Sequence, residues 1–556
     1  MQKVWGMKQE ANVIGWGIAI CVTAILVNFP NLSIHHLVTG NDLMFHLSRI
    51  EGIQEGLLSG QMPVRLNPFQ LSGYGMPTSL FYPDLFLYVP ALLRICGVSL
   101  ITAWKAFLLL VSFLTAFASW WAFSTYTRSV RTGAIATLFY LVAFYRLLAM
   151  YISIGVGMLL GMAFLPAAMM AVWLTLRRKA SYWPAVVLFA TCILQSHIIT
   201  SILFLGAVVV MTALSCWRFR LPEVRWAAVE AAGFTAVLNL WFYLPMLYFH
   251  RHMDYLMKSV THEGIQLVIY SFLEADCYIG SAMLALFFVV VLVAFWKRWR
   301  FPATFWILIV LSAGLILLMV SRTPWEGWLG RVFSFLQFPN RFVLFPTFFC
   351  ALAMGMAFSQ VRRNVIIGVC VLLCLVSNYL WVFGSAYAIP HGIAKAQRES
   401  VEGFQQRFER EIGQSTGYRD YMDAEVNRQL QSPDDLARKT ADQSLHPADR
   451  IGTAERRGND FVLHCVAGDE AWVELPLFWY AGYAAENLET GEALSVRRDD
   501  EGQVSVLLPP SSGRVHVWYA GLPWFRIVDG ISFLGLLAFL YACKREWNRR
   551  KEGAFA

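Results

Sequence analysis

Long apolar runs separated by short basic clusters are the feature that most constrains the fold of this 556-residue chain. Hydrophobic residues make up 57% of the sequence and charged residues only 15%. A helix needs about 20 predominantly apolar residues to cross a bilayer, and many of the runs reach that length. The pattern therefore predicts an all-α polytopic membrane protein surrounded by lipid. The net charge of +8 is spread over the clusters between the runs, so no nucleic-acid partner is expected.

The basic clusters predict the orientation, because loops on the cytoplasmic side carry an excess of Lys and Arg. They lie at residues 177–179, 218–225, 297–300, 362–363 and 544–551. All of them fall on the cytoplasmic side only if residues 80–97 do not cross the membrane. That segment, with Pro83 and Asp84 near its start, is therefore interpreted as a helix that lies in or re-enters the outer interface.

This choice gives about twelve spans with both termini in the cytoplasm. The predicted spans are approximately residues 13–29, 101–125, 132–150, 155–176, 181–196, 198–216, 227–249, 280–296, 302–320, 342–360, 364–386 and 526–543. Residues 1–386 would form the membrane domain, with residues 30–100 as its first outer loop. Residues 526–556 would form the final span and a basic tail.

The insertion at residues 387–525 is interpreted as a small α+β domain outside the membrane. Residues 394–414 have the charges and scattered apolar positions of a surface helix. From residue 455 the chain is expected to be β-rich, since apolar and polar residues alternate in FVLHCV, AWVELPLF, QVSVLLP and RVHVWYA between Gly, Asp and Pro turns.

The first outer loop contains the best candidate for chemistry, the segment GNDLMFHLSRI at residues 40–50. Asp42 directly precedes a helical pattern over residues 43–58, and Asp42, His46 and Arg49 share one face of that helix. One interpretation is that Asp42 only caps the helix. The other is that it accepts the proton of an attacking hydroxyl, with His46 orienting it or sharing a metal ion and Arg49 neutralising a phosphate. The two interpretations are compatible.

Several segments resemble one family. GNDLMFHLSRI, SGQMPVRLNP and GYGMPTSLFYPDLFLYVPALL resemble the first outer loop of the YfhO-like bacterial membrane proteins, also described as 6-pyruvoyl-tetrahydropterin-synthase-related, of the C-type (GT-C) glycosyltransferase superfamily. FLQFPNRFVLFP at 335–346, LQSHIITSI at 194–202 and ELPLFWYAGYAAENLETG at 474–491 resemble further parts of that family. The first loop carries the specific part of the resemblance.

The resemblance implies a GT-C-like fold in a bacterial plasma membrane, with Asp42 matching the catalytic Asp. It also implies a polyprenyl-phosphate-linked sugar as donor and a glycan or lipid of the cell envelope as acceptor. The superfamily often has a further acidic residue near the third and fourth spans, where this chain reads YISIGVGMLLG at 151–161. This stretch has no carboxylate, which counts against a metal site with two carboxylates of the usual kind. Asp84 is the only nearby substitute in the first loop, so a divalent metal ion held by Asp42, His46 and Asp84 stays open.

Transfer from a lipid-linked sugar phosphate needs one base and several cations, because the phosphate is already a good leaving group. Arginines that fall on the predicted outer side oppose the usual charge bias, and Arg binds phosphate with two parallel hydrogen bonds. The candidates for substrate binding are Arg65, Arg146, Arg331 and Arg341. Headgroup anchoring is the alternative, weighed evenly for Arg146 and Arg331, and favoured for Arg322.

His197 lies between two apolar runs, where an ionisable group is costly and often functional, although it could equally hydrogen-bond a neighbouring helix. Tyr74, Tyr82 and Trp325 could stack on sugar faces, but aromatic residues at this depth more often belong to the interfacial belt.

These observations favour a glycosyltransferase that acts at the outer face of the membrane. A lipid or polysaccharide flippase is an alternative that would require paired discontinuous spans, which the sequence does not display. A non-catalytic envelope assembly protein is another, and in it Asp42 would be dispensable. The sequence specifies neither the sugar, the acceptor nor the oligomeric state.

Overall fold

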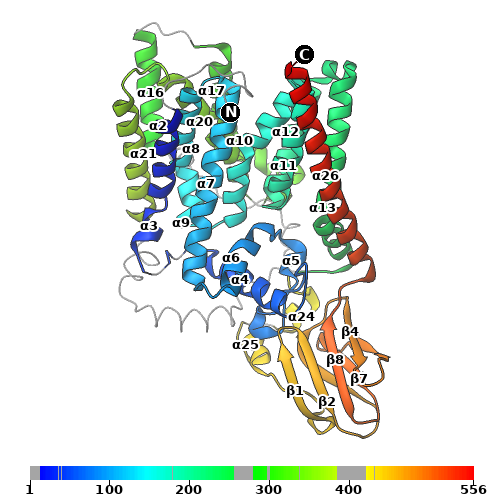
Figure 1. Ribbon diagram of the computed structural model, residues 1–556. Coiled ribbons are helices and arrows are strands. Elements are labelled where there is room, and N and C mark those ends of the chain that lie inside the picture. The colour runs from blue at the N-terminus through cyan, green and yellow to red at the C-terminus, as the bar shows by residue number, and fades with distance from the viewer. Residues whose placement is uncertain are drawn as a thin grey trace.

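The computed structural model describes residues 13–35, 37–38, 40–177, 179–255, 280–296, 301–336, 338–384, 421–430 and 433–555. The predicted surface helix at 394–414, the predicted outer segment 256–279, and residues 178 and 297–300 of the basic clusters lie outside these ranges. The described chain is mostly helical, with a small β-sheet domain at one end of the helical bundle (Figure 1). Helix α2 begins, and helix α26 ends, at the opposite end of the bundle.

Seven helices of the described chain are long and apolar enough to cross a membrane, or eight if the bent pair α8 and α9 forms one span. The seven are α7 (Leu100–Thr127), α10 (Val156–Arg177), α13 (Pro222–His252), α17 (Ala303–Val320), η7 with α20 (Pro339–Val343 and Leu344–Phe358), α21 (Asn364–Gly384) and α26 (Pro523–Phe555). The bent pair consists of α8 (Val130–Leu141) and α9 (Phe144–Tyr151), with 43° between the two helices.

The prediction of about twelve spans is therefore not confirmed. The remaining predicted spans correspond to shorter apolar helices, α2 (Val13–Leu26), α11 (Trp183–Leu194), α12 (Ile198–Ala213) and α16 (Ser281–Trp296). The longest of these four have 16 residues, or about 24 Å, whereas the hydrocarbon core is about 30 Å thick.

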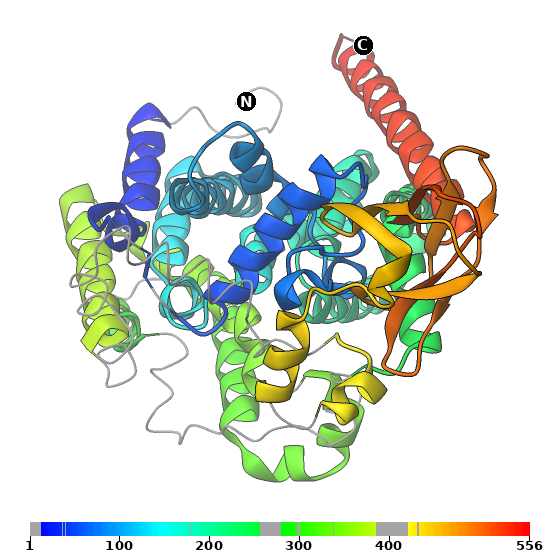
Figure 2. The same cartoon turned by 90° about the horizontal axis from the view of Figure 1, so that it is seen from below.

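The predicted first outer loop consists of short helices that lie across the end of the bundle (Figure 2). They are α3 (Phe29–Ser33), α4 (Leu43–Leu58), η1 (Leu71–Gly73), α5 (Thr78–Phe81), η2 (Leu85–Leu87) and α6 (Tyr88–Ile95). Helix α4 has the predicted bounds. Helix α6 has eight residues, about 12 Å, so residues 80–97 contain no helix of spanning length, as predicted. Two further short helices, α18 (Arg322–Glu326) and α19 (Trp328–Val332), precede η7.

The β-sheet domain has two antiparallel sheets, preceded by α24 (Ala424–Gln429) and α25 (Pro433–Ala441). The strands are β1 (Ile451–Arg457), β2 (Asp460–Cys465), β3 (Ala471–Phe478), β4 (Tyr483–Asn487), β5 (Ala493–Leu494), β6 (Val496–Arg498), β7 (Gln503–Leu508) and β8 (Gly513–Tyr519). One sheet has the order β1-β2-β8-β4-β5 and the other β3-β7-β6. Strands β2, β3, β7 and β8 are the four segments in which the sequence alternates. In β2 buried residues alternate with partly exposed ones, as expected when one face covers a core.

That core is shared with the first outer loop. Leu66, Tyr74 and Phe81 of the loop are buried in the same hydrophobic cluster as Val473 of β3 and Val515 of β8. Backbone hydrogen bonding reinforces the packing, since the Phe478 N–H donates to the Tyr74 carbonyl over 2.9 Å. The first outer loop and the β-sheet domain therefore pack as one unit at the end of the bundle.

Candidate functional site

The start of α4 is held against the segment between α9 and α10. The backbone N–H groups of Asn41 and Asp42 donate to the carbonyls of Ile152 and Ser153 over 2.9 and 3.1 Å. Gly40 makes this approach possible, because a Cβ there would lie 2.5 Å from the Ile152 carbonyl oxygen. Asp42 occupies the N-cap position, but its side chain makes no capping hydrogen bond. Its half-buried carboxylate therefore does not act as the cap of α4.

His46 lies one turn further along α4 and is 1% exposed. Its Nδ1 is 3.1 Å from Arg49 Nη1, and a guanidinium only donates, so Nδ1 is the acceptor. The proton of the neutral ring is then on Nε2, which fits the hydrogen bond between the ring and the backbone of Ile154. Burial holds the pKa of His46 well below its usual range, and the charge of Arg49 lowers it further. His46 is therefore a neutral, fixed imidazole at physiological pH.

Arg49 is 1% exposed, and each of its nitrogens has a partner. Nε donates to Asp84 Oδ1 over 2.9 Å, and Nη2 donates to the Pro83 carbonyl over 2.8 Å and to the same carboxylate oxygen. The guanidinium also lies over the ring of Tyr82, 4.2 Å from its centroid. This packing turns Asp84 into a counter-ion. Its second oxygen, Oδ2, is buried without a hydrogen-bond partner among the described residues.

A metal ion on Asp42, His46 and Asp84 does not fit this arrangement. The hydrogen-bonding atoms of His46 are engaged by Arg49 and the backbone of Ile154, and Asp84 pairs with Arg49. Within the described ranges, no three His, Cys, Asp or Glu side chains are grouped as metal ligands. We therefore derive no step that requires a metal ion.

Tyr82 connects this group to the break between α11 and α12. Its ring centroid is 6.0 Å from that of His197, and burial raises the pKa of its hydroxyl. The two approach each other beside Gly157 of α10, where a Cβ would lie 2.4 Å from Tyr82 Oη and 2.8 Å from the Ser196 carbonyl oxygen. His197 caps α12, since its Nδ1 accepts from the Thr200 N–H over 3.3 Å. In that tautomer Nε2 carries the hydrogen and is a donor.

Arg341 lies in η7 and is half-buried. Its Nη1 is 3.9 Å from Met158 Sδ, and its guanidinium lies 5.8 Å from the ring centroid of Phe338. Nε is buried and has no hydrogen-bond partner, and no carboxylate of the described chain pairs with the charge. Arg341 and Arg49 are nevertheless the charged neighbours that most affect His197. Arg341 is therefore a cation beside this group whose hydrogen-bonding capacity is not fully used by the described residues.

The structure brings together seven of the predicted site residues from four separate parts of the sequence. We call this group the α4 cluster: Asp42, His46, Arg49, Tyr82, Asp84, His197 and Arg341.

The other four predicted residues lie elsewhere. Arg65 forms an ion pair with Asp529 of α26 and donates to the Trp241 carbonyl over 3.1 Å. The Tyr74 hydroxyl donates to the Asp442 carbonyl over 2.6 Å, on the side of the β-sheet domain. Arg331 is exposed on α19.

Arg146 is fully buried in α9. It donates to the Leu141 carbonyl over 3.2 Å and to Ser112 Oγ over 2.9 Å. These contacts tie α9 to α7, apart from the α4 cluster.

Two residues next to the cluster were not anticipated from the sequence. Trp104 stacks on His46 with ring centroids 6.4 Å apart. Ile154 has a φ of 50°, a left-handed conformation that is strained for a β-branched residue, at about 1–3 kcal/mol. Its neighbours include Gly40 and His46. Apolar residue identity gives no signal for either role, although Gly155 and Gly157 just after Ile154 are residues that often accompany an irregular backbone.

No protein-family model matches this sequence, and no curated protein matches it. The resemblance to the YfhO-like family is therefore not confirmed. Among solved structures, the chain is similar to the arabinofuranosyltransferase AftD from Mycobacteria, with a TM-score of 0.41 and 15% identity over 68% of this chain and 27% of that chain. It is also similar to the oligosaccharyltransferase AglB from Archaeoglobus fulgidus in complex with an inhibitory peptide and a dolichol-phosphate, with a TM-score of 0.36 and 13% identity over 71% of this chain and 59% of that chain. The chain thus spans about a quarter of the first protein and less than two thirds of the second.

Proposed function

We propose that this chain is a membrane glycosyltransferase that moves a sugar from a polyprenyl-phosphate-linked donor to a cell-envelope acceptor at the outer face of the membrane. The observation that carries the proposal is the composition of the α4 cluster. It combines a half-buried carboxylate that does not cap its helix, a neutral imidazole and two arginines. Arg49 is neutralised by a carboxylate, whereas Arg341 has no carboxylate partner among the described residues.

The proposed reaction uses these groups as follows. Asp42 accepts the proton of the acceptor hydroxyl while that oxygen forms a bond to the anomeric carbon of the donor sugar. The bond between the anomeric carbon and the phosphate oxygen breaks, and its electron pair leaves with the lipid phosphate. Arg341 binds the departing phosphate, and the Tyr82 hydroxyl and His197 Nε2–H are further donors near it. Arg49 and His46 position the other residues of the α4 cluster.

The proposal requires the α4 cluster and the β-sheet domain to lie on the outer side. Two exposed native cysteines test this, Cys96 after α6 and Cys216 next to the basic residues of η4 (Cys216–Arg220). A membrane-impermeant maleimide applied to intact cells should label Cys96 and leave Cys216 unlabelled, when each is retained as the single cysteine. The reverse pattern would place the α4 cluster in the cytoplasm and contradict the proposal.

The donor is tested by mass spectrometry of lipids that co-purify with the protein. A polyprenyl phosphate or its sugar derivative should be enriched with the wild-type chain and depleted with Arg341→Ala. Arg331→Ala, which removes an exposed arginine of α19, is the matched control and should retain the lipid. Equal amounts of the lipid with both variants would remove Arg341 from the donor site.

A lipid flippase is the second candidate, because α8 and α9 meet at a break with 43° between them, and α11 and α12 are separated only by residues 195–197. A flippase would bind the same lipid but would not separate the sugar from its phosphate. Release of free lipid phosphate in the presence of an acceptor fraction therefore distinguishes the two functions.

A further inference from the structure

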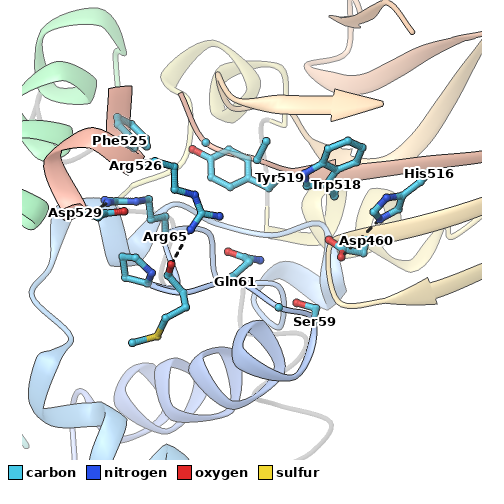
Figure 3. A pocket seen from close by; sticks show the side chains of 15 residues that line it. Ser59, Gln61, Arg65, Asp460, His516, Trp518, Tyr519, Phe525, Arg526 and Asp529 are labelled. Atoms are coloured by element: carbon cyan, nitrogen blue, oxygen red, sulfur yellow. Dashed lines mark hydrogen bonds and ion pairs between the residues drawn. The ribbon is translucent and has the colours of Figure 1, made fainter. Parts of the chain in front are cut away.

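A cavity of about 240 Å³ lies at the other end of α4, where the first outer loop meets the β-sheet domain and α26 (Figure 3). Its lining comes from residues 59–65 of the loop, Asp460 of β2, Trp518 and Tyr519 at the end of β8, and the first turns of α26. The volume is slightly below the range of about 300–1,000 Å³ typical of small-molecule sites, which suits a ligand of the size of one sugar ring.

Gln61 is the residue that points to a ligand. It is 8% exposed and lines the cavity, and neither its amide oxygen nor its amide nitrogen has a hydrogen-bond partner among the described residues. Figure 3 shows it among the residues of the cavity wall, with Arg526 and Tyr519 above it in that view. Buried amides are normally paired, because an unmade hydrogen bond costs free energy. A ligand that both donates and accepts hydrogen bonds would satisfy both atoms.

The charges around the cavity cancel. Arg65 pairs with Asp529, Asp460 lies 3.9 Å from His516, and Arg526 donates to the Met62 carbonyl over 3.0 Å. Two arginines therefore face two aspartates when the histidine is neutral. Such a lining offers many hydrogen-bond donors and acceptors but no surplus positive charge for a phosphate.

Aromatic residues complete the lining. Trp518 is half-exposed, and its ring stacks on His516 with centroids 4.5 Å apart. Tyr519 and Phe525 are also part of the wall. An amphipathic ring beside polar groups matches the two kinds of surface on a sugar, the apolar C–H face and the hydroxyl rim.

We propose that this cavity binds one neutral sugar residue of the glycan acceptor. Helix α4 has 16 residues, so its ends are about 24 Å apart, and a sugar in the cavity is too far from Asp42 to be the one that reacts. The acceptor is then a chain of several sugars, held at a distance from its reacting end. Its role as an acceptor site rests on the proposed function, whereas sugar binding itself does not.

Saturation-transfer NMR on the full chain in lipid nanodiscs tests the site. Sugar-based detergents must be avoided because they would compete. The probes are methyl glycosides of glucose, galactose, mannose and N-acetylglucosamine, the corresponding trisaccharides in solution, and the same sugars as lipid headgroups in the disc. We expect binding of at least one soluble probe, weakened about tenfold by Gln61→Ala and about fivefold by Trp518→Ala. Trp472→Ala, on the other sheet, is the matched control and should bind as the wild type does.

Three outcomes would overturn the proposal. These are no binding by the wild type of any soluble probe, unchanged binding by both Gln61→Ala and Trp518→Ala, and displacement of the sugar by inorganic phosphate. Binding only of the headgroup form would assign the cavity to a glycolipid and also overturn the acceptor role.

Asp42→Asn separates the two proposals, since it should lose transfer and keep sugar binding. If the wild type transfers sugar but binds no soluble probe, only the proposed sugar site in the cavity is refuted. If Asp42→Asn binds sugar and also keeps full transfer, only the proposed mechanism is refuted.

Discussion

Arg49 and Arg341 both bring a guanidinium to the α4 cluster, but their surroundings differ. Arg49 is completely buried and bonded to Asp84, to the Pro83 carbonyl and to His46. Arg341 is half-buried, has a thioether and an aromatic ring as neighbours, and keeps a buried Nε without a partner among the described residues. A cation that is already paired stabilises the site that contains it, whereas an under-paired cation is available to a ligand. We therefore expect changes around Arg49 to affect stability and changes of Arg341 to affect substrate use.

The comparison of Arg49 with Arg341 bears on function only if a base acts beside both arginines. Asp42→Asn tests for that base and should have the largest effect on activity. We expect transfer to fall by about 10²–10⁴-fold, the usual contribution of a general base, with an unchanged melting temperature. The side chain makes no capping hydrogen bond that the amide could lose. Steady-state turnover and a thermal melt in detergent measure the two quantities. Wild-type turnover by this variant would show that Asp42 is not the general base. The proposed roles of Arg49 and Arg341 in the reaction would then lose their support.

Asp84→Ala should have the largest effect on stability. It leaves Arg49 buried without its carboxylate, and removal of one partner from a buried ion pair costs about 3–5 kcal/mol. The melting temperature should fall markedly. The double variant Arg49→Met with Asp84→Ala is the control and should recover part of the loss, because it removes the stranded charge. A stable single variant would show that Arg49 is not held by Asp84, and the contrast with Arg341 would fail.

Arg341→Lys tests the other side of the comparison. Lysine keeps the charge but loses the planar fork that binds phosphate with two hydrogen bonds. We expect the apparent KM for the donor to rise about tenfold or more, since a hydrogen bond to a charged group contributes about 1.5–3 kcal/mol, with little change in the melting temperature. Unchanged kinetics with a lowered melting temperature would make Arg341 a structural residue like Arg49.

The smallest expected effect concerns pH. His46 binds a proton below about pH 6.5 in the unfolded chain, but its pKa in the folded protein is much lower because of burial and the charge of Arg49. The unfolded state therefore binds more protons below pH 6.5, and stability falls as the pH falls, by up to about 1.4 kcal/mol per pH unit for this one group. Melting temperatures between pH 7 and pH 5 should decline less steeply in His46→Gln. An equal decline would mean that His46 is not kept neutral beside Arg49.

The local part of the α4 cluster could be predicted from the sequence, and the distant part could not. The helix over residues 43–58 and the common face of Asp42, His46 and Arg49 follow from spacing. His197 and Arg341 were recognisable as ionisable residues in apolar surroundings. Their approach to α4, however, depends on the packing of α10, α12 and η7, which has no local signature.

Contacts between residues far apart in the sequence also determine which predicted site residues lie outside the α4 cluster. Arg65 was a reasonable phosphate ligand by its place in the loop, but its partner Asp529 is 464 residues away in the sequence. Tyr74 resembles an exposed aromatic residue until the β-sheet domain covers it and Phe478 packs against its ring, with centroids 4.9 Å apart. Neither contact could be derived from residue type or spacing.

The shared core of the first outer loop and the β-sheet domain has a consequence for biosynthesis. Arg456 donates to the Gly73 carbonyl across 383 residues, so the loop is made long before the strands that cover it. At about 5–20 residues per second, the ribosome needs roughly 20–80 s to synthesise the intervening chain. During that time Leu71, Tyr74 and Phe81 have no β-sheet domain to bury them. The nascent protein would therefore depend on a chaperone or on the membrane surface to protect this loop until the β-sheet domain has been synthesised.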